Sequence, residues 1–144
     1  MQLCTFTLDG LYFGVDVLRV QEVLRFQEMT PVPLAPPETR GLINLRGQVV
    51  TAVDLRLRLG LAERPAGPDA PGPMNVIVRA GDDTVSLLVD QIGDVVEPGD
   101  EALEPPPATL AGRVRDVTAG VYKLGGRLLL VMDADRTLTL PAHA

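Results

Sequence analysis

Two stretches of the chain match each other without a gap, and this internal repeat limits the folds that the sequence can adopt. Residues 41–54 read GLINLRGQVVTAVD, and residues 120–133 read GVYKLGGRLLLVMD. A glycine, a leucine, a second glycine and a final aspartate recur at the same places. The shared apolar pattern around a central turn predicts a β-hairpin in each half, and the repeat indicates duplication of one short-stranded unit.

Alternating apolar and polar residues predict further strands on either side of the repeat. Residues 3–8 and 11–15 alternate in this way around an Asp-Gly dipeptide, which favours a two-residue hairpin turn. Residues 76–78 and 85–89 repeat the arrangement in the second half. Residues 62–73 are rich in Pro and Gly and contain no large apolar residue, which predicts a loop between two lobes.

One short helix is predicted near the N-terminus. Asp16 can act as its N-cap, because its side-chain oxygen can accept hydrogen bonds from amides in the first turn of residues 17–26. On a helical wheel three valines, Val20 among them, fall on a packing stripe, whereas Leu18 and Glu22 fall on the opposite side. The pattern therefore predicts a helix with one buried face and one exposed face.

The composition of the chain indicates what these strands build. Hydrophobic residues make up 46% of the 144 residues but aromatic residues only 3%, so the core must consist of Val, Leu and Ile, which favour strands. Two similar lobes follow from the duplication, and closure of each lobe into a small barrel would remove its exposed strand edges. We therefore expect a mainly β fold with a few short helices.

Residue types that carry catalysis or bind metal are scarce in this chain. The single histidine, His143, lies one residue from the end of the sequence, and the single cysteine, Cys4, lies in a predicted strand as an apolar filler. The acidic pairs at residues 82–83 and 100–101 fall in predicted turns, where solvated carboxylates are common. We expect no enzymatic activity, no metal site and no cofactor.

Charge and hydropathy exclude several kinds of partner. The net charge of -6 opposes binding to nucleic-acid backbones and to anionic lipid. No apolar run approaches the roughly 18 residues of a membrane span, and the first ten residues lack the regions of an export signal. We expect a cytoplasmic protein that neither binds nucleic acid nor inserts into the membrane.

Three segments of the sequence form a recognisable set. They are YFGVD at residues 12–16 running into VQEV at 20–23, GLINLRGQVV at 41–50 running into VDLR at 53–56, and VD with GDV within 89–95. The N-L-R-G hairpin followed by V-D-L-R is quite specific at this distance from the first segment. Together the segments resemble the CheW family, and the similarity extends from about residue 3 to residue 140.

The resemblance implies one CheW-like domain over residues 1–144, built from two SH3-like, five-stranded barrels side by side. The lobes are expected at approximately 16–74 and 75–133, with the N- and C-terminal segments completing them. Family members are non-enzymatic adaptors that couple chemoreceptors to the histidine kinase CheA in chemotaxis or chemosensory signal transduction. The implied partners are the cytoplasmic tip of a chemoreceptor, a methyl-accepting chemotaxis protein, and the regulatory domain of CheA, at receptor arrays beneath the inner membrane.

The resemblance also implies a surface that contacts the receptor or the kinase. Its residues are Arg46, Glu22, Val20, Gly41, Asn44 and Leu18. Arg46 corresponds to the arginine of the N-L-R-G motif, and Glu22 to the glutamate of the first helix, both associated with coupling. Each position also has a structural reading: Arg46 as a residue of the hairpin turn, Glu22 as solvated surface and Val20 as core.

Two other functions are compatible with the same sequence. The chain could scaffold a signalling pathway that has no motility output, with the same contacts. Alternatively, a small-barrel ligand-binding domain would take a metabolite in the cleft between its lobes.

Overall fold

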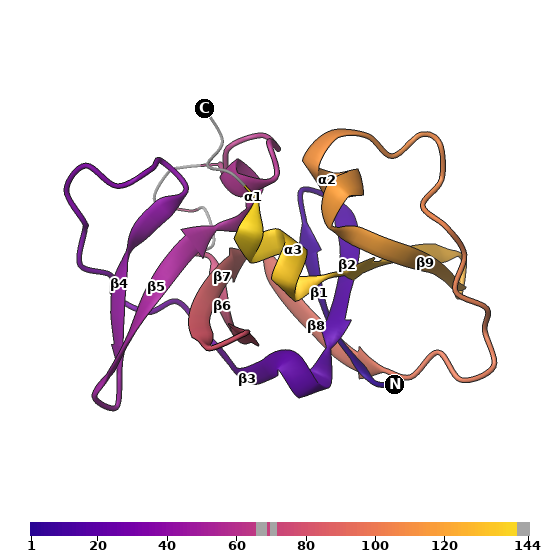
Figure 1. Ribbon diagram of the computed structural model, residues 1–144, viewed down its shortest axis with the longest axis horizontal. Helices are drawn as coiled ribbons and strands as arrows, with labels where there is room; N and C mark the ends of the chain where they lie inside the picture. The colour runs from indigo at the N-terminus through magenta and orange to yellow at the C-terminus, as the bar shows by residue number, and fades with distance from the viewer. Residues whose placement is uncertain (66–68, 70–71, 141–144) are drawn as a thin grey trace.

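The computed structural model describes residues 1–65, 69 and 72–140, and its strands form two five-stranded sheets that lie side by side (Figure 1). The terminal sheet has the strand order β8-β1-β2-β10-β9, and the central sheet has the order β3-β6-β7-β5-β4. The strands are β1 (Leu3–Leu8), β2 (Leu11–Asp16), β3 (Val20–Leu24), β4 (Thr39–Leu45), β5 (Gln48–Asp54), β6 (Met74–Ala80), β7 (Asp83–Val89), β8 (Gln91–Val96), β9 (Thr118–Leu124) and β10 (Arg127–Met132). The helical elements are η1 (Val17–Arg19), α1 (Leu55–Arg58), α2 (Gly112–Val117) and α3 (Ala134–Thr139). The expected mainly β fold with two lobes and a few short helices is confirmed.

Each sheet contains one edge-side strand that comes, in sequence, directly after a hairpin of the other sheet. The hairpin β1–β2 belongs to the terminal sheet, but β3, the next strand along the chain, pairs with β6 in the central sheet. In the same way the hairpin β6–β7 belongs to the central sheet, but β8 pairs with β1 in the terminal sheet. Parallel pairing of β5 with β7, and of β10 with β2, adds the hairpins β4–β5 and β9–β10. The lobes therefore have the same topology and exchange one strand each.

The two copies of the sequence repeat occupy equivalent places in the two sheets. Residues 41–54 form most of the hairpin β4–β5, and residues 120–133 form most of β9–β10. In each copy the final aspartate caps a helix: the side chain of Asp54 accepts from a main-chain amide of α1, and that of Asp133 from one of α3. Capping satisfies amides that would otherwise lack a partner at the start of a helix. The predicted hairpins are confirmed.

The predicted helix over residues 17–26 is wrong. The side chain of Asp16 does accept a 3.0 Å hydrogen bond from the amide of Leu18, but the helical turn ends after three residues. The chain continues as β3, whose alternation leaves Glu22 half-buried and Val23 exposed, the reverse of the helical wheel. A short apolar run is compatible with the periodicity of a helix and with that of a strand. Here the antiparallel pairing of residues 20–24 with β6 stabilises the strand.

The sheets divide the chain at other places than the expected lobes at 16–74 and 75–133. β6 and β7 lie in the central sheet with β3 to β5, so the central sheet consists of five consecutive strands, and the terminal sheet consists of β1 and β2 with β8 to β10. The predicted loop at residues 62–73 connects α1 to β6 and does not join the two lobes. Residues 66–68 and 70–71 of this loop lie outside the described residues.

The sheets also close less completely than barrels. Over the described residues no strand ladder joins β3 to β4 or β8 to β9. Instead, single residue pairs fasten the connectors to the edge strands: Thr30 pairs with Leu42 of β4, and Glu104 pairs with Val121 of β9. The two lobes therefore share the same partial closure after the exchanged strand.

Aliphatic side chains are packed on both faces of each sheet. In β10, Leu129 packs inside the terminal lobe, whereas Leu130 belongs to a core that continues across both lobes. In β7, Leu88 packs inside the central lobe and Leu87 joins the shared core. A strand that is buried on both faces has a continuous apolar run in its sequence, and β7 and β10 both have such a run. The shared core holds the lobes together and leaves the tips of the hairpins β4–β5 and β9–β10 in solvent.

Candidate functional site

The tip of the hairpin β4–β5 carries the arginine of the N-L-R-G motif. Arg46 and Gly47 have φ values of 50° and 91°, as a two-residue hairpin turn with two left-handed positions requires. The side-chain oxygen of Asn44 accepts a 3.0 Å hydrogen bond from the amide of Gly47. Asn44 therefore shapes the turn, and the turn holds Arg46 in an exposed position.

Arg46 forms an ion pair with Glu22 of β3. β3 and β4 are the two end strands of the central sheet, so the sheet curls until its edges approach each other. The side chain of Arg46 is 71% exposed and that of Glu22 is 22% exposed. A pair at this exposure contributes about 0–1 kcal/mol to folding. The ion pair therefore orients the guanidinium and leaves most of it in solvent.

The remaining predicted residues separate into exposed and packed positions. Leu18 lies in η1 and is 82% exposed. Val20 begins β3, is half-buried and packs against the shared core. The structure thus brings Glu22 and Arg46 together and leaves Leu18 exposed.

Gly41 occupies a position where two main-chain segments nearly touch. The amide and carbonyl of Leu42 form hydrogen bonds of 2.8 Å and 2.9 Å with Thr30. A Cβ atom on Gly41 would lie 2.5 Å from the Thr30 carbonyl oxygen, and the φ of Gly41 is +155°. At the equivalent Gly120, a Cβ would lie 2.9 Å from the carbonyl oxygen of Glu104. The glycine common to both repeats therefore lets the connector cross the edge strand.

We expect Gly41→Ala to lower the free energy of unfolding by about 1–3 kcal/mol, because the new methyl group forces the connector away from β4. Urea unfolding at neutral pH measures this loss. Gly81→Ala is the matched control: it also substitutes a glycine at positive φ, +60°, but a Cβ there meets nothing within 4 Å. If the two variants had equal unfolding midpoints and only Gly41→Ala lost partner binding, Gly41 would belong to the contact surface and its role would not be structural.

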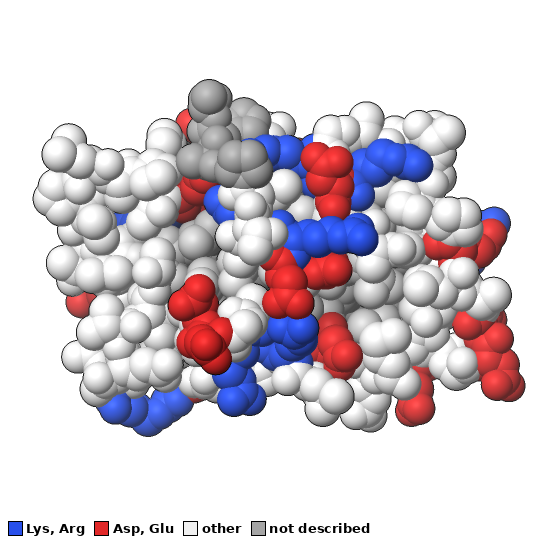
Figure 2. Space-filling model, viewed as in Figure 1, with Lys and Arg blue, Asp and Glu red and all other residues white. Residues whose placement is uncertain are grey.

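A second group of charged residues lies between the lobes, and none of its members was singled out from the sequence. Figure 2 shows basic and acidic side chains gathered along the middle of this face. Three pairs form this inter-lobe charge band: Arg19–Asp135 at 2.8 Å, Arg56–Asp90 at 2.6 Å and Arg58–Glu38 at 3.1 Å. They connect η1 to α3, α1 to the link between β7 and β8, and α1 to the segment before β4.

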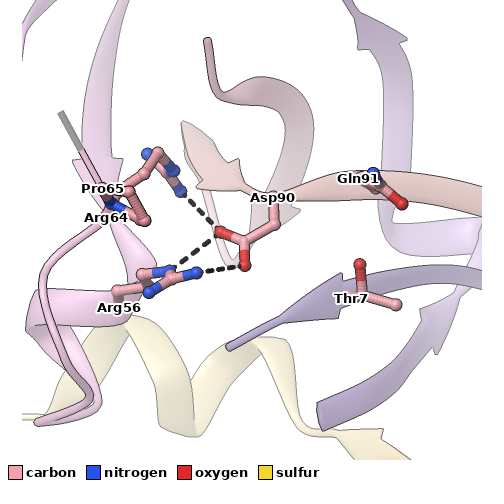
Figure 3. Close-up of a pocket in the computed structure, with 6 residues that line it drawn as sticks. All are labelled: Thr7, Arg56, Arg64, Pro65, Asp90 and Gln91. Carbon is pink, nitrogen blue, oxygen red and sulfur yellow. Dashed lines mark hydrogen bonds and ion pairs between the residues drawn. The ribbon is translucent and has the colours of Figure 1, made fainter. Parts of the chain in front are cut away.

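Asp90 is the most heavily hydrogen-bonded carboxylate of the inter-lobe charge band (Figure 3). It accepts from Nε and NH2 of Arg56 at 2.9 Å and 2.6 Å, from NH2 of Arg64 at 3.1 Å, and from the amide of Asp9 at 2.8 Å. Burial alone would raise the pKa of Asp90, but these hydrogen bonds, with Arg56 first, outweigh it and lower the pKa. The hydrogen bond to Asp90 in turn raises the pKa of Arg56. Both groups are therefore ionised at neutral pH.

Arg58 fastens the C-terminal end of α3 to α1. Its guanidinium donates to the carbonyls of Thr137 at 2.7 Å, Leu138 at 3.0 Å and Leu140 at 2.8 Å, and to Oε1 of Glu38 at 3.1 Å. The side chain of Arg58 is only 10% exposed and that of Glu38 only 3%. Burial lowers the pKa of Arg58, and the charge of Glu38 opposes that shift. The carbonyls at the end of α3, which lack helical partners, thus receive donors from the other lobe.

The described part of the chain offers little for metal or nucleophilic chemistry. It contains no group of three or more His, Cys, Asp or Glu side chains placed to hold a metal ion. Cys4 is buried, as expected of an apolar filler, and burial raises the pKa of its thiol. His143 lies outside the described residues. None of the described helices has the length and apolar character needed to cross a membrane.

Comparisons with known proteins agree with the fold. The CheW-like domain model matches residues 2–142. The chain is 30% identical over 134 residues to the chemotaxis protein CheW of Treponema pallidum, which covers 92% of this chain and 78% of that protein. It is 28% identical over 137 residues to the chemotaxis protein CheW of Bacillus subtilis, which covers 95% and 86%. The crystal structure of the scaffolding protein TtCheW from Thermoanaerobacter tengcongensis matches in fold with a TM-score of 0.84, covering 99% of this chain and 94% of that chain at 24% identity.

The two β lobes and the match to the CheW-like domain model place this chain in a class of small adaptors of signal transduction. The family match extends over nearly the whole chain. The chain belongs to the CheW family and is a chemotaxis coupling adaptor. This family consists of non-enzymatic adaptors that couple receptors to CheA.

Proposed function

We propose that this chain couples a chemoreceptor to the histidine kinase CheA without catalysing a reaction itself. In this proposal it contacts the cytoplasmic tip of a methyl-accepting chemotaxis protein and the regulatory domain of CheA, in the cytoplasm at receptor arrays beneath the inner membrane. The tip formed by Arg46, Asn44 and Glu22, with Leu18, supplies contacts to one of these partners. Val20 and Gly41 act indirectly, by holding β3 and the connector in place.

The observation that carries the proposal is the exposed guanidinium of Arg46. A hairpin turn does not require arginine at this position, and the equivalent residue of the second repeat is Gly125. The ion pair with Glu22 adds little to stability, so folding alone gives no reason for this side chain. Arginine is enriched among the residues that dominate protein–protein binding, because its planar donors and apolar stem both contribute to contacts.

We expect Arg46→Ala to weaken binding of the receptor fragment or the kinase regulatory domain at least about tenfold, as removal of a binding hot spot does. The free energy of unfolding should change by no more than about 1 kcal/mol. Calorimetric titration and thermal unfolding measure the two effects. Arg136→Ala is the control, because Arg136 is also exposed, 58%, and also pairs with one carboxylate, Asp133. Unaltered affinity for both partners would contradict the assignment.

A charge swap separates partner contact from an effect inside the chain. The variant carrying Arg46→Glu together with Glu22→Arg restores an ion pair of reversed polarity between β3 and the hairpin tip. If Arg46 contacts a partner, binding stays weak in the swapped protein. Recovery of binding in the swap would show that Arg46 acts only by fixing the tip.

We expect Leu18→Ser to weaken the same binding several-fold with little change in stability, because Leu18 is almost fully exposed and loses only contacts to partners. The measurement is the same titration with each partner. Val95→Ser in β8 of the terminal sheet, where the native side chain is 56% exposed, is the apolar control. A loss that is equal in both variants would mean that neither position is specific.

The main alternative keeps the scaffold role but changes the output. A protein that organises a non-motility pathway would use the same surface, so binding data cannot separate the two. Deletion of the coding sequence does separate them: a motility adaptor is needed for directed swimming, and a non-motility scaffold is not.

A further inference from the structure

The turn that carries Leu18 is fixed to the rest of the molecule by the arginine next to it. η1 lies where the chain crosses from β2 to β3, and none of its residues is buried. Arg19 donates to the two carboxylate oxygens of Asp135 at 2.9 Å and 2.8 Å, and to the main-chain carbonyl of Arg79 at 3.2 Å. One guanidinium therefore joins η1 to the start of α3 and to the end of β6.

The contact between Arg19 and Asp135 fixes an orientation more than it stabilises the fold. Each terminal nitrogen of the guanidinium faces a different oxygen of the carboxylate, and such two-pronged pairs add geometric specificity to the attraction. The two side chains are 41% and 53% exposed, and ion pairs at this exposure contribute little to the free energy of folding. The hydrogen bond from Arg19 is also the main cause that lowers the pKa of Asp135, so the carboxylate is ionised at neutral pH.

α3 is a firm anchor for Arg19 because other contacts already hold this helix. It follows β10 of the terminal sheet and lies between the two sheets (Figure 1). Its Thr137 is fully buried, and Arg58 of α1 donates to three main-chain carbonyls at its end. The side chain of Arg19 is therefore attached to an element that both lobes keep in place.

Leu18 stands between two neighbours that are fixed in this way. Its own amide donates to the side chain of Asp16 at 3.0 Å, and the amide of Val17 donates to the carbonyl of Gln2 at 3.0 Å. On the other side, Arg19 holds the end of the turn. The side chain of Leu18 is nevertheless 82% exposed. A contact residue that a rigid turn presents loses less conformational entropy when a partner binds.

Building on the proposed function, in which Leu18 contacts a partner, we propose that Arg19 and Asp135 are positioning residues for that contact. Their ion pair holds η1 in the binding conformation before the partner arrives, and neither side chain needs to touch the partner. The partner concerned is the one, receptor tip or kinase regulatory domain, whose binding Leu18→Ser weakens.

The test compares Arg19→Gln, Asp135→Ala and the variant with both changes by calorimetric titration with that partner. Each single change should weaken binding about threefold to tenfold, the size expected when one more contact residue must be ordered on binding. The double variant should bind no more weakly than the weaker of the single variants, because both changes break the same contact. Asp116→Ala, at an exposed carboxylate of α2, is the control and should keep the native affinity.

A Leu18→Ser background separates positioning from direct contact. There, Asp135→Ala should cause no further loss of affinity, since the side chain that the ion pair positions is gone. An equal loss in both backgrounds, or native affinity in Asp135→Ala, would overturn the proposal and leave the proposed function intact.

A measurement without a partner tests the ion pair even if the native protein binds neither partner, a result that would count against the proposed function itself. The order parameter of the Leu18 amide, from nitrogen-15 relaxation, should fall from about 0.85 towards about 0.6 in Arg19→Gln and in Asp135→Ala. An order parameter that stays at the native value in both variants would show that the ion pair does not hold η1.

Discussion

Arg58→Met is expected to lower the free energy of unfolding by about 3–5 kcal/mol, the cost typical of removing one partner from a buried ion pair. Arg58 donates to Glu38 and to three carbonyls at the end of α3, so its loss removes donors from both at once. Methionine fills the space of the aliphatic stem, which limits the effect of a cavity. Urea unfolding at pH 7, with the change in midpoint read at constant slope, measures the loss.

Two further variants identify the source of that loss. Arg58→Lys keeps the positive charge but cannot reproduce the fork of donors, so it should fall between the native protein and Arg58→Met. Arg58→Met combined with Glu38→Gln should regain part of the stability, because the buried negative charge is removed together with its partner. A loss below about 1 kcal/mol in Arg58→Met would mean that the guanidinium does not support the end of α3.

Asp90→Asn should destabilise the protein by about 3 kcal/mol at pH 7, because Arg56 loses the carboxylate that binds two of its nitrogens. The effect depends on pH in a definite direction. The pKa of Asp90 is lower in the folded protein than the ordinary value of about 3.9, so its contribution is complete above about pH 5 and is lost as the pH falls from about 4 through the folded pKa.

The difference in stability between the native protein and Asp90→Asn should therefore shrink as the pH falls below about 4. Urea midpoints at several pH values across this range give the curve. Asp82→Asn, in the exposed turn between β6 and β7, is the control and should leave both the midpoint and its pH dependence almost unchanged. A constant difference at all pH values would show that Asp90 stabilises the fold through its shape and not through its charge.

The local features of the fold were predictable where a short signal decides the structure. Turns with glycine, such as Arg46-Gly47 and Gly125-Gly126, require left-handed backbone positions, and both turns were found. The capping roles of Asp54 and Asp133 follow from their place after a strand. β8 was missed, because Gly93 and a neighbouring aspartate interrupt its apolar pattern, and the assignment of β3 failed because its partner β6 lies more than 50 residues further along the chain.

The candidate site was predictable only in part, for a related reason. The motif resemblance singled out Glu22 and Arg46, but their contact depends on the curl of the whole central sheet, which no local pattern specifies. The inter-lobe charge band was not predicted. Arg56 and Arg58 stand in a short polar-looking helix, and nothing in the sequence indicates that both are nearly buried against residues 20 to 80 positions away.

The reciprocal placement of β3 and β8 means that this domain has no point at which it can be cut into two self-sufficient pieces. A fragment that ends after β7 would keep the central sheet but leave β1 without its β8 neighbour, and it would lack the hairpin β9–β10. Such open edges recruit strands from other molecules. Proteolysis or truncation between the lobes should therefore yield aggregates or intertwined dimers, and the two lobes should fold or unfold together.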